Sequence, residues 1–149
     1  MTNWTASRGF PLGRHGAWLL GLWSLFLLFG FVVAYHLQPD PRGYGTHQRL
    51  GLPPCTFRTV FDIPCPSCGM TTSISNFVHG RFLDSARANV GGLLLAMICL
   101  VQIPWCWLSI YSGRMWRIAR PEVAALWLLS VLFAVCAVQW IARLVLLSA

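Results

Sequence analysis

Three long stretches of the chain are predominantly apolar and contain no Asp, Glu, Lys or Arg. They are residues 17–37 ("AWLLGLWSLFLLFGFVVAYHL"), 91–110 ("GGLLLAMICLVQIPWCWLSI") and 123–142 ("VAALWLLSVLFAVCAVQWIA"). A helix rises 1.5 Å per residue, so it needs about 20 apolar residues to cross a hydrocarbon core about 30 Å thick. Each stretch meets this length. The pattern therefore predicts three transmembrane helices.

The segment 38–90, between the first two predicted spans, follows a different pattern. Its first part, "QPDPRGYGTHQRLGLPP", is rich in Pro and Gly and predicts an irregular loop. Further on, apolar residues recur at helical spacing, which predicts an amphipathic helix of about three turns (Met70, Ile74, Phe77, Val78). Ser67 suits its N-cap and Gly80 the position after its last turn.

A second short helix begins near Asp84 and leads into the second span. We expect the two short helices to form a hairpin in the membrane interface, with the apolar face against lipid or the spans. The predicted fold class is an all-α integral membrane protein. It consists of one membrane domain, residues 1–149, with an interfacial hairpin that bears a Cys-x-x-Cys motif.

Composition agrees with a bilayer as the solvent. Of the 149 residues, 56% are hydrophobic and 10% are charged, whereas a soluble domain carries about a quarter charged residues. The net charge of +7 comes from eleven arginines and no lysine, against three Asp and one Glu. Because these arginines flank the apolar stretches, we expect them to meet anionic lipid headgroups rather than nucleic acid.

Arginine density predicts the orientation. With three spans, the N-terminal segment and the loop 111–122 share one side, and these short segments hold five arginines (Arg8, Arg14, Arg114, Arg117, Arg120). The other side holds six over a greater length, mixed with three Asp. The positive-inside rule then places the N-terminus in the cytoplasm and the cysteine-bearing segment outside.

A cleaved signal peptide is the alternative interpretation of the first span. Arg8 and Arg14 would form its basic leader, and Val32-Val33-Ala34 its small-residue cleavage site. The apolar stretch continues through that site and has full transmembrane length, which favours a retained helix.

The stretch "PPCTFRTVFDIPCPSCGMTTSISNFVHGRFLDSARANV" carries a recognisable combination of residues. Cys55 is followed by Arg58, then by the run Cys65-Pro66-Ser67-Cys68-Gly69-Met70-Thr71, and further on by Gly80, Ala86 and Asn89. This combination resembles the signature of a bacterial membrane-protein family, domain of unknown function 2752. The resemblance implies a small helical protein of the cell (inner) membrane and supplies no reaction. Thr72 and Val90 depart from the family pattern, which has an Arg and a Pro at these positions.

Six cysteines fall into two groups. Cys99, Cys106 and Cys136 lie in predicted spans, where a thiol behaves as a small hydrophobe. Cys55, Cys65 and Cys68 lie outside the spans. A Cys-x-x-Cys that runs into a helix suits thiol–disulfide exchange, with Cys65 or Cys68 as the attacking thiolate and Cys55 as the resolving partner. No strand precedes Cys65, which excludes a thioredoxin-like fold.

Two other interpretations of the same three cysteines stay open. Cys55, Cys65 and Cys68 would bind zinc or another metal as thiolates, with His47 as a better fourth ligand than the more distant His79. Alternatively, two of them form a disulfide that fixes the loop above the membrane. Closing the longer loop, Cys55 to Cys68, would stabilise the fold by about 3 kcal/mol.

The sequence contains no phosphate-binding loop, no G-x-S-x-G, no H-E-x-x-H and no pair of carboxylates with a base. We therefore expect a non-enzymatic protein, an accessory or scaffold subunit whose cysteine-fixed loop contacts another membrane or secreted protein. The alternatives are a membrane thiol–disulfide exchange protein and a metal-binding protein.

Overall fold

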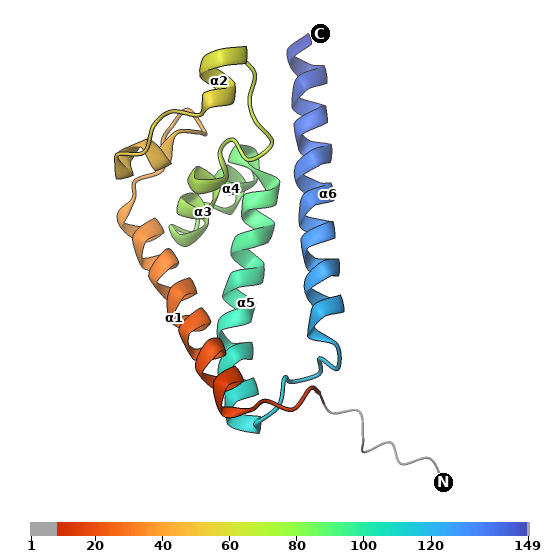
Figure 1. Cartoon of the computed structure of the whole chain (residues 1–149). Coiled ribbons are helices and arrows are strands. Elements are labelled where there is room, and N and C mark those ends of the chain that lie inside the picture. Colours follow the sequence, from red (N-terminus) through yellow and green to blue (C-terminus); the bar gives the residue numbers. More distant parts are fainter. Residues whose placement is uncertain (1–8, 149) are drawn as a thin grey trace. The chain divides into compact units, whose positions relative to one another are not determined.

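The three long helices are present. A computed structural model describes residues 9–148, so Arg8 of the predicted basic segment lies outside the described residues. Helices α1 (Arg14–His36), α5 (Val90–Ser112) and α6 (Pro121–Ser148) are each long and apolar enough to cross a membrane (Figure 1). The prediction of an all-α protein with three transmembrane helices is confirmed, and these helices contact the lipid bilayer.

The helix ends differ from the predicted ends in one informative place. Helix α6 begins at Pro121, whose fixed φ and missing N–H suit the first helical position. It continues to Ser148, beyond the predicted limit of 142. The last turns of α6 therefore carry Arg143 as a helical residue, and this arginine contacts the cysteine-bearing segment.

Four short helical elements lie between α1 and α5: the 3₁₀ helix η2 (Thr46–Leu50), α2 (Thr56–Phe61), α3 (Met70–Val78) and α4 (Phe82–Ala88). Helices α3 and α4 pack against each other, which confirms the expected hairpin. The segment expected to be an irregular loop contains η2. Helix α2 was not expected either, because it has no buried residue and so no amphipathic pattern reveals it.

Helix α3 starts and ends on glycines. Its N-cap is Gly69 in the left-handed region, with φ 87° and no side-chain capping bond, so the prediction of Ser67 as N-cap is wrong. At the other end, Gly80 has φ 74°, its N–H donates to Phe77 O, and Arg81 N–H donates to Asn76 O. This pair of bonds is a Schellman motif, and it confirms Gly80 as the residue after the last turn.

The described residues form two compact units, and the long helices contribute to both. One unit contains residues 98–130 and the described part of 1–29. In it, Trp23 Nε1 donates to Gln102 Oε1 at 3.4 Å, and Trp105 Nε1 donates to Trp116 O at 2.9 Å. Backbone bonds of Phe10 to Met115 and Ile118 close this unit. An isolated bridge between Pro11 and Arg114 is the β-structure found within residues 9–148.

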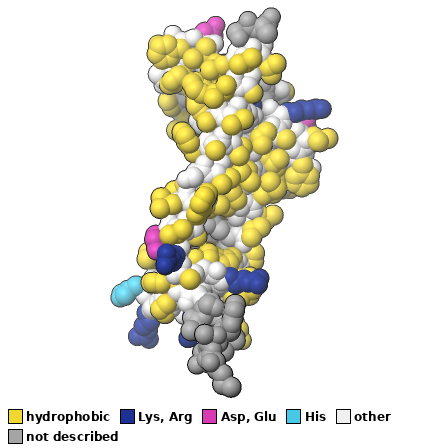
Figure 2. Space-filling view, turned by 90° about the vertical axis from the view of Figure 1, so that its right-hand side faces the viewer, with side chains coloured by type: hydrophobic (Ala, Val, Ile, Leu, Met, Phe, Trp, Pro, Cys, Tyr) yellow, Lys and Arg dark blue, Asp and Glu magenta, His cyan; other side chains and the backbone are white. Residues whose placement is uncertain are grey.

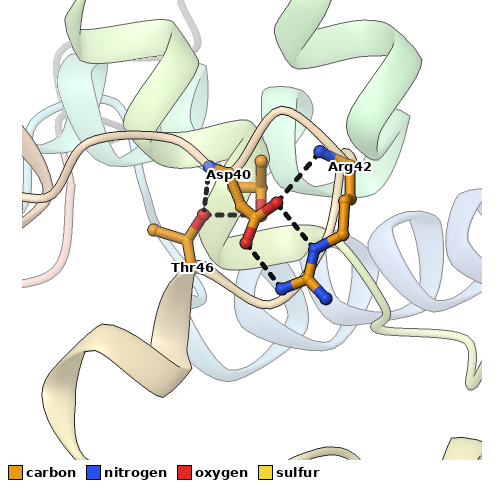
Figure 3. Close-up of polar contacts among 4 residues, drawn as sticks. Asp40, Arg42 and Thr46 are labelled. Carbon is orange, nitrogen blue, oxygen red and sulfur yellow. Dashed lines mark hydrogen bonds and ion pairs between the residues drawn. The ribbon is translucent and has the colours of Figure 1, made fainter.

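The second unit contains residues 30–97 and 131–149 as far as they are described, and it holds the cysteine-bearing segment. The loop after α1 is tied down by Asp40 (Figure 3). The Asp40 carboxylate accepts three hydrogen bonds from Arg42, at 2.8–3.0 Å, and this lowers the pKa of Asp40 to about 2. The Asp40 N–H donates to Thr46 Oγ1, which also bonds Thr72 Oγ1 of α3 at 2.8 Å.

The distribution of side chains is inverted relative to a soluble protein. Hydrophobic side chains cover most of the face seen in Figure 2. The side chains that are fully buried are mostly polar: Asn89, Thr46, Thr72, Ser24, Ser73, Ser75, Ser85 and Ser109, with Cys106 among them. In lipid, an apolar side chain gains nothing by leaving the surface, whereas a polar group must find a partner inside.

Candidate functional site

Cys55 and Cys65 lie next to each other, although ten positions separate them in the chain. Cys55 is the N-cap of α2, and the chain returns past α2 to Cys65. Each of the two thiols affects the pKa of the other, and both line the same pocket. All six cysteines, each within the described residues, are free thiols. The structure therefore brings the first extramembrane cysteine and the Cys-x-x-Cys motif to the same pocket.

The surroundings shift the pKa values of the two thiols in opposite directions. The backbone N–H of Arg58 lowers the pKa of Cys55, and the Cys65 thiol and the N–H of Phe57 lower it further. Burial raises the pKa of Cys65, although the Ser67 hydroxyl, 3.3 Å from its sulfur, opposes this effect. The surroundings therefore favour ionisation of Cys55 over ionisation of Cys65.

Cys68 is buried and has a different neighbour. Its sulfur lies 3.9 Å from Nη1 of Arg58, whose guanidinium stacks over the ring of Tyr44 at 3.7 Å from the ring centre. Helix α3 begins two residues after Cys68, at Met70.

The three thiols share one pocket of about 520 Å³. We call it the thiol pocket. Its wall includes Cys55, Cys65, Cys68, Arg58, Tyr44 and His47, and it is completed by residues of η2 and of the first turns of α3. A pocket of this size admits a peptide side chain or a short loop of another protein.

Asn89 connects the cysteine turn to the second span. It lies between α4 and α5 with an extended backbone, and its Oδ1 accepts the N–H of Gly92 at 2.9 Å, an N-cap bond for α5. Its Nδ2 donates to Cys68 O at 3.1 Å. One buried side chain therefore anchors both the start of a transmembrane helix and the Cys-x-x-Cys turn.

A serine pair fastens the hairpin beneath this turn. Ser73 Oγ of α3 and Ser85 Oγ of α4 lie 2.9 Å apart, and Ser73 Oγ also contacts the carbonyl oxygens of Ser85 and Asn89 at 2.9 and 2.7 Å. Ser85 Oγ donates to Ser73 O at 2.8 Å. Since both hydroxyls are fully buried, the bonds replace those lost to water and fix the two helices in one register.

Gly69 allows the cysteine turn to approach its neighbours. A Cβ atom at this position would lie 2.5 Å from Ala88 O and 2.6 Å from Gly43 O, and the backbone has a positive φ. Both constraints exclude a side chain. The glycine after the second cysteine of the motif is therefore required by packing.

Two side chains of α6 complete the support, and neither was expected from the sequence. Trp140 Nε1 donates to Pro64 O at 2.7 Å. Arg143 donates to Cys68 O at 3.1 Å and to Ala88 O at 2.5 Å. The one signal in the sequence is that Arg143 directly follows the third apolar stretch.

The predicted metal ligands are partly assembled. Cys55, Cys65, Cys68 and His47 line one pocket. Within residues 9–148, however, no group of three or more His, Cys, Asp or Glu side chains is arranged to hold a metal ion. His79 lies against α1, where its ring stacks on Tyr35 at 5.2 Å between ring centres and its Nδ1 contacts Ser75 O. The metal ligand set stays a prediction.

Comparison with known proteins supports the resemblance drawn from the sequence. The family described as protein of unknown function DUF2752 matches residues 55–103, which contain the three extramembrane cysteines, the hairpin and the start of α5. No curated protein and no solved structure matches the chain. The chain is thus a membrane protein with a region typical of a family whose function has not been assigned.

Proposed function

We propose that Cys55 and Cys65 form a reversible dithiol–disulfide pair, and that the protein exchanges disulfides with another membrane or secreted protein. The observation that carries this proposal is that the two thiols line one pocket, combined with opposite shifts of their pKa values. A low-pKa thiol attacks, and a neighbouring thiol resolves. Relative to the sequence-based hypothesis, the attacking role moves to Cys55 and the resolving role to Cys65.

The proposed exchange is balanced in atoms and electrons. The Cys55 thiolate attacks one sulfur of a disulfide in the partner protein, and the other partner sulfur leaves as a thiolate and takes up a proton. The Cys65 thiol then loses its proton and attacks Cys55 Sγ, which releases the second partner sulfur. The partner disulfide gains two electrons, and a Cys55–Cys65 disulfide forms. The reverse sequence oxidises a partner dithiol.

The thiol pocket supports this chemistry because it is open to a segment of another protein and contains both sulfurs. Cys68 takes a supporting role in the proposal, since it is buried and held beside Arg58. The exchange also fits an exoplasmic cysteine segment in the cell membrane, with a cytoplasmic N-terminus, because disulfides persist in oxidising compartments.

Trapping with Cys65→Ser tests the proposal. This variant keeps the attacking thiol but cannot resolve, so it should accumulate mixed disulfides that non-reducing electrophoresis detects and reductant removes. Cys55→Ser and the double variant should accumulate none, and Cys99→Ser, a membrane-embedded control, should behave as the unmodified chain. Because the pKa of Cys55 is lowered and that of Cys65 raised, a membrane-impermeant maleimide should label Cys55 at lower pH than Cys65 on intact cells.

The competing functions give different results in the same experiment. If no variant traps a partner and the cysteine replacements only lower the amount of protein, the cysteines fix a loop of an accessory subunit. If the purified chain holds about one zinc ion, and Cys65→Ser loses it, the thiols are metal ligands. Labelling only after the cells are opened would contradict the exoplasmic orientation.

A further inference from the structure

A second pocket of the same unit is surrounded by arginines. It has a volume of about 420 Å³, and four guanidinium groups line it together with a single carboxylate (Arg42, Arg58, Arg87, Arg143 and Asp62). The arginines come from the loop after α1, from α2, from α4 and from the end of α6. We call it the arginine pocket. It adjoins the thiol pocket through Tyr44, Arg58 and Cys68, which line both.

The charges of the arginine pocket are not balanced within the described chain. Arg42 is paired with Asp40 at 2.8 Å, and Arg87 with Asp84 at 3.5 Å. Arg58 and Arg143 have no carboxylate within 4 Å among residues 9–148, and Asp62 forms no ion pair there either. Two partly buried cations without a counter-ion favour the binding of an anion.

Both uncompensated guanidinium groups are held in place. Arg58 stacks on Tyr44 and its Nη1 contacts the Cys68 sulfur at 3.9 Å, so the guanidinium is fixed while its other N–H groups can bind a ligand. Arg143 is oriented by its bonds to the carbonyl oxygens of Cys68 and Ala88, and by a longer contact with Arg87 O at 3.4 Å. Planar groups fixed in this way bind phosphate oxygens with little loss of side-chain entropy.

Exposed apolar side chains surround the pocket. Leu146, one turn beyond Arg143, lines the pocket and is 78% exposed. Helix α2, which carries Arg58, exposes Phe57, Val60 and Phe61. An apolar helix surface next to arginines is typical of a segment that lies at the level of lipid headgroups. A ligand of this pocket therefore needs an anionic group joined to an apolar chain.

We propose that the arginine pocket binds the phosphate group of an anionic phospholipid, with Arg58 and Arg143 as its principal ligands and Arg87 at the rim. Free phosphate offers the same chemistry to the guanidinium groups but lacks the acyl chains that would contact Leu146 and α2. The lipid would fix α2, and with it Cys55, against α6. This inference is independent of the proposed disulfide exchange, because it involves no thiol chemistry.

Lipid retention measures this binding directly. The full chain is purified in micelles that contain equal amounts of phosphatidylglycerol and phosphatidylcholine, and bound lipid is counted by native mass spectrometry. Phosphatidylglycerol should be retained selectively. Arg58→Gln should reduce its affinity about fivefold, as expected for one basic residue at a lipid surface. Arg87→Gln, at the rim and paired with Asp84, should reduce it less than Arg58→Gln does but more than the control. Arg49→Gln, an exposed arginine of η2 outside the pocket, is the charge-matched control and should change the affinity less than about twofold.

The outcomes separate the sources of the phosphate. Equal retention of the two lipids, or an equal loss with Arg49→Gln, would overturn the proposal. Displacement of the lipid by millimolar inorganic phosphate would assign the pocket to free phosphate and overturn the lipid assignment. Arg87 has an exposed side chain, so Arg87→Gln should keep its fold, and circular dichroism checks helix content in each variant.

Discussion

The lipid-facing surface of the long helices and the interior of the α3–α4 hairpin obey opposite rules. On α6, large apolar residues such as Phe133 and Leu129 are exposed. In the hairpin, Ser73, Ser85 and Asn89 are buried and hydrogen-bonded. The spans are held in place mainly by the membrane, whereas the hairpin depends on individual polar contacts. Stability and site geometry should therefore respond strongly to small changes in the hairpin and weakly to large changes on the lipid face.

The largest effect is expected at Gly69. Gly69→Ala places a side chain at a positive φ, which costs a non-glycine residue about 1–2 kcal/mol, and its Cβ would overlap two carbonyl oxygens. Together these effects should lower the free energy of unfolding by at least about 3 kcal/mol. Gly80→Ala is the matched control, because φ is also positive but nothing lies within 4 Å of its Cβ. It should lose only about 1–2 kcal/mol. Unfolding in denaturing detergent, monitored by circular dichroism, measures the stability of both variants. Equal losses of stability would contradict the close packing at Gly69.

A pair of serine substitutions is expected to change stability by an intermediate amount. Ser73→Ala removes a hydroxyl that bonds Ser85 and Asn89, and should destabilise the chain by about 1–3 kcal/mol. Ser24 is equally buried, but its hydroxyl has no hydrogen-bond partner among the described residues. Ser24→Ala should therefore be neutral or stabilise by up to about 1 kcal/mol. The same unfolding assay applies, and destabilisation by both substitutions would mean that Ser24 has a partner outside the described residues.

The smallest effect is expected on the lipid face. Phe133 is 75% exposed on α6. We expect its side chain to contact lipid in both the folded and the unfolded chain, so Phe133→Ala removes little that is specific to the folded state. Its cost should stay below about 1 kcal/mol, compared with about 3–5 kcal/mol for the same truncation in a soluble core. A loss above about 2 kcal/mol in the unfolding assay would show that this face of α6 packs against another protein.

The sequence alone determined the three spans, the helical hairpin and the cysteines outside the membrane. These features depend on local patterns, because the length of an apolar stretch and helical spacing are read within about 20 residues. The tertiary structure decided which thiols meet. It brought Cys55, ten residues earlier in the chain, into one pocket with Cys65 and Cys68. It also brought Arg143 of α6 to the cysteine turn and made Asn89 a link between that turn and α5. Contacts of this kind join residues far apart in the chain, so they follow from packing and from the pairing of buried polar groups, for which the sequence has no periodic signal.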